Sequence, residues 1–157
     1  MYRKIFSVVG MLFLLIGCGD EFHAKHNQGK NCLECHSFSS GVTIFKSIHA
    51  VDYDENDAAR GYNIQLDMTS GEKITYQSGN GYGNVLSHSR DIVGTFTAQV
   101  VDDKGTVLNQ SHQDTHDESR LACNRCHTQE GKHGAPGRVV IFDYFNTLVT
   151  DINSSGA

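Results

Sequence analysis

The sequence predicts a mainly β protein in which an antiparallel β-sandwich is inserted between two short Cys-x-x-Cys-His segments. Three observations predict this fold. Short runs of β-branched and aromatic residues alternate with polar residues, glycine-rich turns separate the runs, and no helical period competes with the alternation. The Cys-x-x-Cys-His pattern occurs once on each side of the runs. We expect both copies to lie on irregular or short helical segments.

The first element, residues 1–17, is predicted to be a lipoprotein signal peptide. Arg3 and Lys4 precede the apolar run 5–16, which is too short to span a membrane comfortably. The run ends in Leu15-Ile16-Gly17-Cys18, which resembles the bacterial lipobox, where the cysteine receives a diacylglyceryl group and becomes the mature N-terminus. The alternative is an ordinary signal peptide that leaves Cys18 as a spare thiol. We expect an exported protein, lipid-anchored on the periplasmic side of a membrane or on the outer membrane or cell surface.

The mature chain, 18–157, is predicted to be one acidic domain. Removal of residues 1–17 takes away two basic residues and no acidic one, so the formal charge changes from -5 to -5 - 2 = -7. This charge argues against a nucleic-acid partner. The remaining 157 - 17 = 140 residues fit a single domain of ordinary size.

The predicted sandwich spans about residues 40–110, with a closing strand at about 138–149. A glycine-rich loop at 78–84 and the turn Asp103-Lys104-Gly105 separate its strands. Met68 lies in a strand-like stretch and is expected in the core. The expected strands are 41–46, 62–66, 73–76, 94–101, 106–108 and 138–145.

The two flanking patterns are haem c attachment motifs. The first is Cys32-Leu33-Glu34-Cys35-His36 and the second is Cys123-Asn124-Arg125-Cys126-His127. In such a motif each cysteine adds its sulfur to a haem vinyl group, and the histidine is the proximal ligand of the iron. A zinc ribbon would set its cysteine pairs much closer together, and neither a ribbon nor a redox dithiol requires the histidine. We therefore predict two covalently held haems, which agrees with export because haem is attached outside the cytoplasm.

The residues around the motifs carry a family resemblance. Arg120-Leu121-Ala122-Cys123-Asn124-Arg125-Cys126-His127-Thr128, Gly134-Ala135-Pro136-Gly137-Arg138 and His26-Asn27-Gln28-Gly29-Lys30-Asn31-Cys32 resemble segments of small multihaem c-type cytochromes of anaerobic, metal-respiring bacteria. The resemblance implies electron relay between redox partner proteins such as other cytochromes, and two histidines on each iron. Self-assembly into filaments is compatible with it. The insert loosely resembles a transthyretin-like or carboxypeptidase-regulatory sandwich, and an Ig-like topology is a further possibility.

Two histidines stand at matching positions before the motifs, and we predict them to be the distal ligands. His26 lies six residues before Cys32, and His116 lies seven before Cys123. Because six extended residues reach up to about 20 Å, each histidine can cap its own haem or the other, and we favour crossed ligation. Of the other histidines, His23 and His112 are the nearby rivals, and His49, His88 and His133 are expected to be solvated.

This ligand set predicts a low-potential electron carrier rather than an enzyme. Two imidazoles give iron a lower potential than a methionine and a histidine do. The alternative is a haem enzyme or a gas- or peroxide-binding sensor, in which one iron keeps an open site. Seven histidines beyond the two proximal ones are available for two distal positions, which favours the carrier.

An acidic run, Asp52, Asp54, Asn56 and Asp57, superficially resembles a calcium loop. Such a loop needs glycine at its sixth position, where this chain has Asp57, and glutamate at its twelfth, where it has Asn63. We expect a solvated loop.

Overall fold

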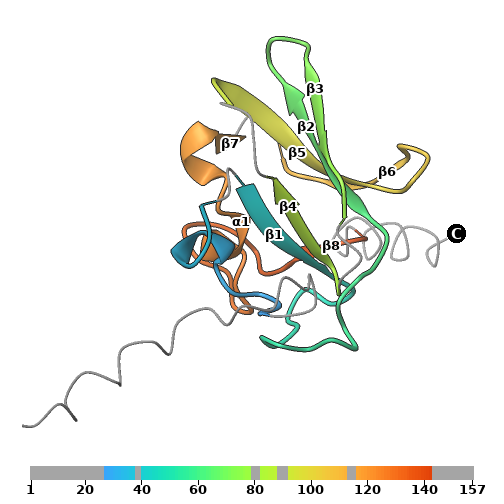
Figure 1. The fold of residues 1–157 in the computed structure, drawn as a ribbon, viewed down its shortest axis with the longest axis vertical. Coiled ribbons are helices and arrows are strands. Elements are labelled where there is room, and N and C mark those ends of the chain that lie inside the picture. The colour runs from blue at the N-terminus through green and yellow to red at the C-terminus, as the bar shows by residue number, and fades with distance from the viewer. Residues whose placement is uncertain (1–26, 38–39, 79–81, 88–91, 113–115, 143–157) are drawn as a thin grey trace, which may run out of the picture.

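The structure is a computed structural model that describes residues 27–37, 40–78, 82–87, 92–112 and 116–142. Within these ranges the chain is mainly β, with two sheets and few helical turns, consistent with a β-sandwich (Figure 1). Several predictions fall outside the described residues, namely the signal peptide with Cys18, the histidines His23, His26 and His88, and the closing strand beyond residue 142.

The smaller sheet has three strands in the order β4-β1-β8, with bounds Asn84–Ser87, Ser40–Phe45 and Val139–Val140. All six residues of β1 are buried, as expected for a central strand covered on both faces. The pairing of β1 with β4 is antiparallel, but that of β1 with β8 is parallel. The prediction of a purely antiparallel sandwich is therefore wrong at this edge, because β8 enters from the second motif and runs in the same direction as β1.

The larger sheet has the strand order β3-β2-β5-β6, and a short strand, β7, also pairs with β5. The bounds are β2 Asn63–Met68, β3 Lys73–Tyr76, β5 Thr95–Val101, β6 Val107–Gln110 and β7 His116–Asp117. Every second residue of β2 and β3 is buried. The alternation read from the sequence thus gives each strand one face toward the core and one toward solvent.

The core lies between the two sheets. Ile44 of the smaller sheet belongs to one buried cluster with Leu66 and Phe96 of the larger sheet. Met68 is 6% exposed in this cluster, so the expectation that it is a core residue is confirmed. Packing of one face of each sheet against the other is what makes the two layers a single unit.

Most of the expected strands are present, but two of the observed ones are not predicted. β4 begins at Asn84, in the part of the chain expected to be a glycine-rich loop, and β7 lies in a stretch read as polar loop. Both are short, at four and two residues. Such segments hold strand geometry through pairing with a neighbour rather than through their own periodicity.

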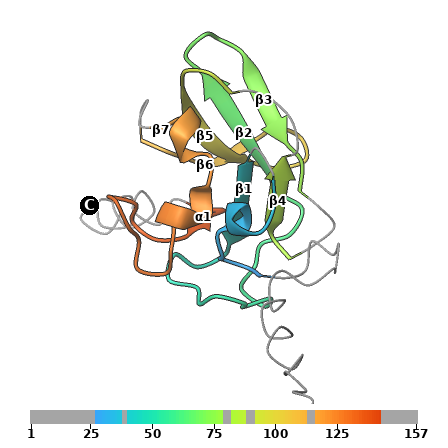
Figure 2. The same ribbon diagram turned by 60° about the vertical axis from the view of Figure 1, so that its left-hand side comes forward.

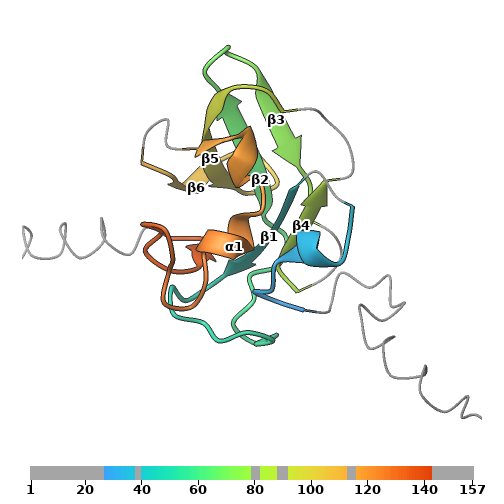
Figure 3. The ribbon, with the colours of Figure 1, turned by 90° about the vertical axis from the view of Figure 1, so that its left-hand side faces the viewer.

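Each motif contains one short helical turn. The 3-10 helix η2 spans Cys32–Glu34, and α1 spans Cys123–Cys126, preceded by the 3-10 helix η3 at Glu118–Arg120. Figures 2 and 3 show the blue turn of the first motif and the orange α1 close to β1, which both contact. Over the described ranges, no helix has the length and apolar character needed to cross a membrane.

Candidate haem site

Both motifs adopt the same local turn. The His36 N–H donates to the Cys32 carbonyl at 3.0 Å, and the His127 N–H donates to the Cys123 carbonyl at 2.9 Å. This bond between residues four apart closes one helical turn. Residues three and four apart on a turn project from one side, so each motif presents its cysteines and its histidine together.

Both motifs contact Gly41 of β1. An added Cβ on Gly41 would lie 2.8 Å from Cβ of Cys32, so the first motif lies directly against the strand. Along the strand edge, Gly41 forms a parallel bridge with Ala122, and its N–H donates to the Leu121 carbonyl at 3.3 Å. Since Cys123 follows Ala122, segments far apart in the sequence become neighbours at β1.

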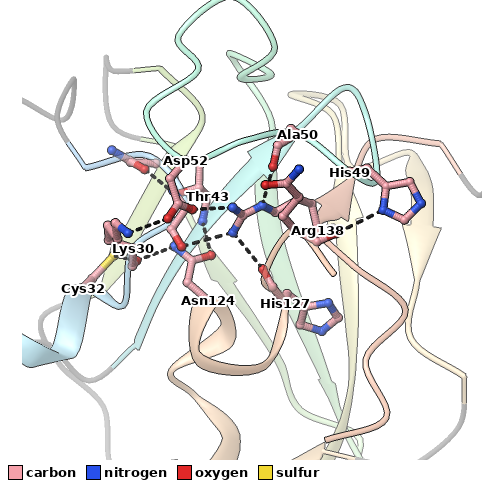
Figure 4. A network of polar contacts seen from close by, with 12 residues as sticks. Lys30, Cys32, Thr43, His49, Ala50, Asp52, Asn124, His127 and Arg138 are labelled. Atoms are coloured by element: carbon pink, nitrogen blue, oxygen red, sulfur yellow. Dashed lines mark hydrogen bonds and ion pairs between the residues drawn. The ribbon is translucent and has the colours of Figure 1, made fainter. Parts of the chain in front are cut away.

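Asn124, the first variable residue of the second motif, connects this motif to β1 and to the segment just before the first motif, called the first segment below. Its Oδ1 accepts the Thr43 backbone N–H at 3.0 Å, and its Nδ2 donates to Thr43 Oγ1 at 3.1 Å and to the Lys30 carbonyl at 2.7 Å (Figure 4). Asn124 is 3% exposed. These bonds satisfy buried backbone groups on β1 and just before Cys32.

Arg138 makes a second tie between the same segments. It is buried, and its Nε donates to the Ala50 carbonyl at 2.9 Å. Its Nη1 donates to the Gly29 carbonyl at 3.1 Å and to the His127 carbonyl at 3.2 Å, and its Nη2 bonds the Asp52 carboxylate. One guanidinium therefore holds the first segment, the loop around residue 50 and the second motif, which suits the fixed fork of arginine donors.

The sequence led us to expect Asp52 in a solvated loop, but Asp52 is an ion-pair partner. It bonds Arg138, and its other oxygen lies 2.5 Å from Nζ of Lys30. Burial opposes its ionisation, but the hydrogen bonds and charges of Lys30 and Arg138 outweigh this, so the pKa of Asp52 lies below its ordinary value. The carboxylate stays charged and balances the buried guanidinium.

A cavity of about 420 Å³ lies between the two sheets beside the second motif. Its walls include Val42 of the smaller sheet and Leu66 of the larger one. The motif side chains that line it are Cys123, Cys126 and His127, and His116 also lines it. A volume of this size is typical of cofactor sites.

Strand pairing brings His116 to this cavity. His116 stands opposite Phe96 in the β7–β5 register, and the two rings lie 5.8 Å apart between centroids at 30°. The chain then turns through η3, where the Asp117 side chain accepts the Ser119 N–H at 2.9 Å, and enters α1. The His116 and His127 rings consequently lie nearly parallel, at 10°, with centroids 6.4 Å apart.

His127 is held in the tautomer that suits a metal ligand. Its Nδ1 lies 2.8 Å from the Gly137 carbonyl oxygen, which only accepts, so Nδ1 carries the proton and Nε2 keeps its lone pair. Burial lowers the pKa of His127, and burial followed by the charge of His127 lowers the pKa of His116. Both imidazoles are therefore neutral near pH 7, which is the form that binds metals.

The centroid distance of the ring pair is compatible with one iron between two imidazoles. Metal–imidazole bonds of about 2 Å would set the two ligating nitrogens roughly 4 Å apart, within the reach of rings at this centroid distance. Parallel aromatic pairs without a metal occur at similar distances, so it is the pair together with Cys123 and Cys126 that points to haem. In the described part of the chain, no three His, Cys, Asp or Glu side chains are grouped to bind a metal ion by themselves.

The ring pair joins His116 to His127, the histidine of the motif that follows it. The crossed ligation favoured from the sequence stays a prediction, and the ring pair supports its alternative, ligation within one motif. The reason is local, because β7, η3 and α1 follow one another and fold His116 back over the same turn. The predicted distal ligand of the first motif, His26, lies outside the described residues.

Three of the four motif cysteines, Cys32, Cys123 and Cys126, are free thiols. Burial raises the pKa of Cys32, and it raises that of Cys123 to about 12, with a further contribution from the thiols of Cys32 and Cys126.

Some contacts at the site were not anticipated from the sequence. His112, a rival ligand named from the sequence, and His133, which is exposed as expected, also line the cavity. The ring of His49 contacts the Gln129 carbonyl through Nδ1 at 3.0 Å. Asn124 carries no sequence signal, because it occupies a variable position of the motif, whereas Arg138 lies in a string that the resemblance covers.

Comparisons of the chain with known protein families, with curated protein sequences and with solved structures give no match.

Proposed function

We propose that the protein is a lipid-anchored dihaem c-type cytochrome that relays electrons at low potential through two bis-histidine haems. The observation that carries the proposal is the parallel His116–His127 ring pair, at a cavity that Cys123 and Cys126 also line. Two thiols and two imidazoles with this spacing match what a covalently attached, six-coordinate haem takes from a protein.

At the second site, Cys123 and Cys126 would hold the haem by thioether bonds, His127 would be the proximal ligand and His116 the distal one. Cys32, Cys35 and His36 would hold the first haem, with His26 as its distal ligand. The iron supplies one-electron redox chemistry when the haem is bound. The sheets on either side of the cavity would limit the access of water to the second haem, and two neutral imidazole ligands would favour the oxidised iron.

The contact of both motifs with β1 supports a relay within one domain. Cys32 packs against Gly41, and Gly41 pairs with the residue before Cys123, so haems attached at these cysteines would lie close together. An electron from a donor would enter at one haem and leave from the other to an acceptor. The formal charge of -7 on the mature chain favours partners that present lysines, such as other redox proteins, through electrostatic steering.

The first prediction is that mature protein carries two covalent haems. Denaturing mass analysis of protein from a host that matures c-type cytochromes should give the chain plus two haems. Changing both Cys123 and Cys126 to Ala should remove one haem, and changing both Cys32 and Cys35 should remove the other. A mass that equals the apoprotein, or zinc in place of haem iron, contradicts the proposal. A mass with only one haem contradicts the dihaem assignment alone.

The second prediction is that Cys18 is acylated. The Cys18→Ala variant should move from the membrane fraction to the soluble fraction of the periplasm or medium, because it loses acyl chains that each contribute about 0.8 kcal/mol per buried CH₂. The matched control is Cys126→Ala, which also loses one thiol but should stay with the membrane. If both variants stay there, the lipid anchor is ruled out.

A further inference from the structure

The peptide between Gly137 and Arg138 is held at both of its polar ends. Its carbonyl oxygen, on Gly137, accepts from Nδ1 of His127 at 2.8 Å. Its N–H, on Arg138, donates to the Ile48 carbonyl at 2.9 Å. A carbonyl whose own peptide N–H is hydrogen-bonded is polarised and is a stronger acceptor, so the contact to His127 is reinforced by Ile48.

Only glycine fits at position 137. Its φ is +146°, a region that residues with a side chain rarely adopt. A Cβ built there would lie 2.5 Å from the Ile48 carbonyl oxygen and 2.8 Å from Ile48 Cγ1. The close approach to Ile48 is what aims the Gly137 carbonyl at His127, so a side chain here would displace the carbonyl.

The Arg138 side chain holds His127 at a second point. Its Nη1 donates to the His127 backbone carbonyl at 3.2 Å, while the peptide before it holds the ring. The same Nη1 donates to the Gly29 carbonyl at 3.1 Å, three residues before Cys32. The guanidinium carbon lies 5.1 Å from the ring centroid of buried Phe45. The arginine that bonds His127 thus also contacts the core and the segment before the first motif.

We propose that Gly137 and Arg138 are positioning residues for the second haem, which fix the tautomer and orientation of His127 and thereby lower the potential of that haem. This inference rests on the proposed function. A hydrogen bond from Nδ1 to a carbonyl makes the imidazole a more basic ligand, which stabilises oxidised iron. Because Arg138 also bonds the Gly29 carbonyl, the orientation of His127 depends in addition on the position of the segment before the first motif.

The test is a redox titration of the full-length holoprotein. In Gly137→Ala the potential of one haem should shift upward while that of the other stays unchanged, because only His127 loses its acceptor. The control is Gly105→Ala in the turn between β5 and β6, where φ is also positive, at +82°, but an added Cβ meets no atom within 4 Å. Gly105→Ala should leave both potentials unchanged. Arg138→Lys keeps the charge without the arginine fork and should shift the same haem by a smaller amount.

A second readout separates positioning from simple stability and does not need haem. In apoprotein, ¹⁵N NMR of the histidine rings should show His127 as the Nδ1–H tautomer in the wild type and a mixture in Gly137→Ala. The positioning proposal is overturned if Gly137→Ala and Arg138→Lys lower the melting temperature but leave both potentials and the tautomer unchanged. Apoprotein mass in the wild type, with the expected tautomer, would instead overturn the proposed function and leave the hold on His127 standing.

Discussion

His116→Ala should open one haem and leave the other closed. Loss of the distal imidazole removes one of two strong-field ligands, so half of the iron should become high-spin and bind carbon monoxide. The wild type should be fully low-spin when oxidised and when reduced, and should bind little carbon monoxide. Optical and electron paramagnetic resonance spectra of the two proteins measure the change. In a protein that also carries Cys32→Ala and Cys35→Ala, all remaining iron should open, because His116 faces the histidine of its own motif.

The matched control for this experiment is His112→Ala. His112 lines the same cavity and is the rival ligand named from the sequence, but it is exposed. Its replacement should leave both haems low-spin. If His112→Ala opens a haem and His116→Ala does not, the ligand assignment is wrong. If unmodified protein binds carbon monoxide at one haem or turns over peroxide, the electron-relay proposal is wrong. The alternative, an enzyme or sensor with one open iron site, then applies.

Asn124→Ala should be strongly destabilising for a substitution outside the ligands. Asn124 is buried and satisfies the Thr43 N–H and the part-buried Lys30 carbonyl. A backbone group left without a partner costs roughly 1–3 kcal/mol, so for two groups the free energy of unfolding should fall by roughly 2–6 kcal/mol. Denaturant titration of the holoprotein measures the loss.

Arg125→Ala is the control, because Arg125 is the other variable residue of the same motif and is exposed. A surface substitution of this kind should change the free energy of unfolding by no more than about 0.5 kcal/mol. Equal effects of the two variants would show that the bonds from Asn124 to the first segment do not stabilise the fold.

The strands could be predicted where side-chain alternation is long enough to stand above chance. Every second residue of β2 and β3 is buried over their whole length, and five of the seven residues of β5 are β-branched or aromatic. β4 and β7, which were not predicted, have only four and two residues. Their strand geometry comes from pairing with β1 and β5, and this pairing leaves no pattern in the local sequence. The parallel edge at β8 likewise depends on where the chain re-enters the sheet.

What the sequence determined by itself is the local pattern on which the haem proposal rests. The spacing of cysteines and histidine within each motif is local, because one helical turn brings residues three and four apart together, so both Cys-x-x-Cys-His motifs could be recognised without a fold. The repeated offset of His26 and His116 likewise required only counting. These features do not depend on how the strands between the motifs are arranged.

What only the tertiary structure decided is which groups meet. The pairing of β7 with β5 sets the His116 ring beside the ring of His127, the histidine of its own motif, which the sequence did not indicate. Burial against β1 makes Asn124 and Arg138 bridges between motifs whose segments lie about 90 residues apart in the chain. The physical reason is that hydrogen bonds to backbone carbonyls depend on the path of the chain and on burial, not on residue type. An asparagine or an arginine read in sequence therefore carries no sign of the carbonyl it will satisfy.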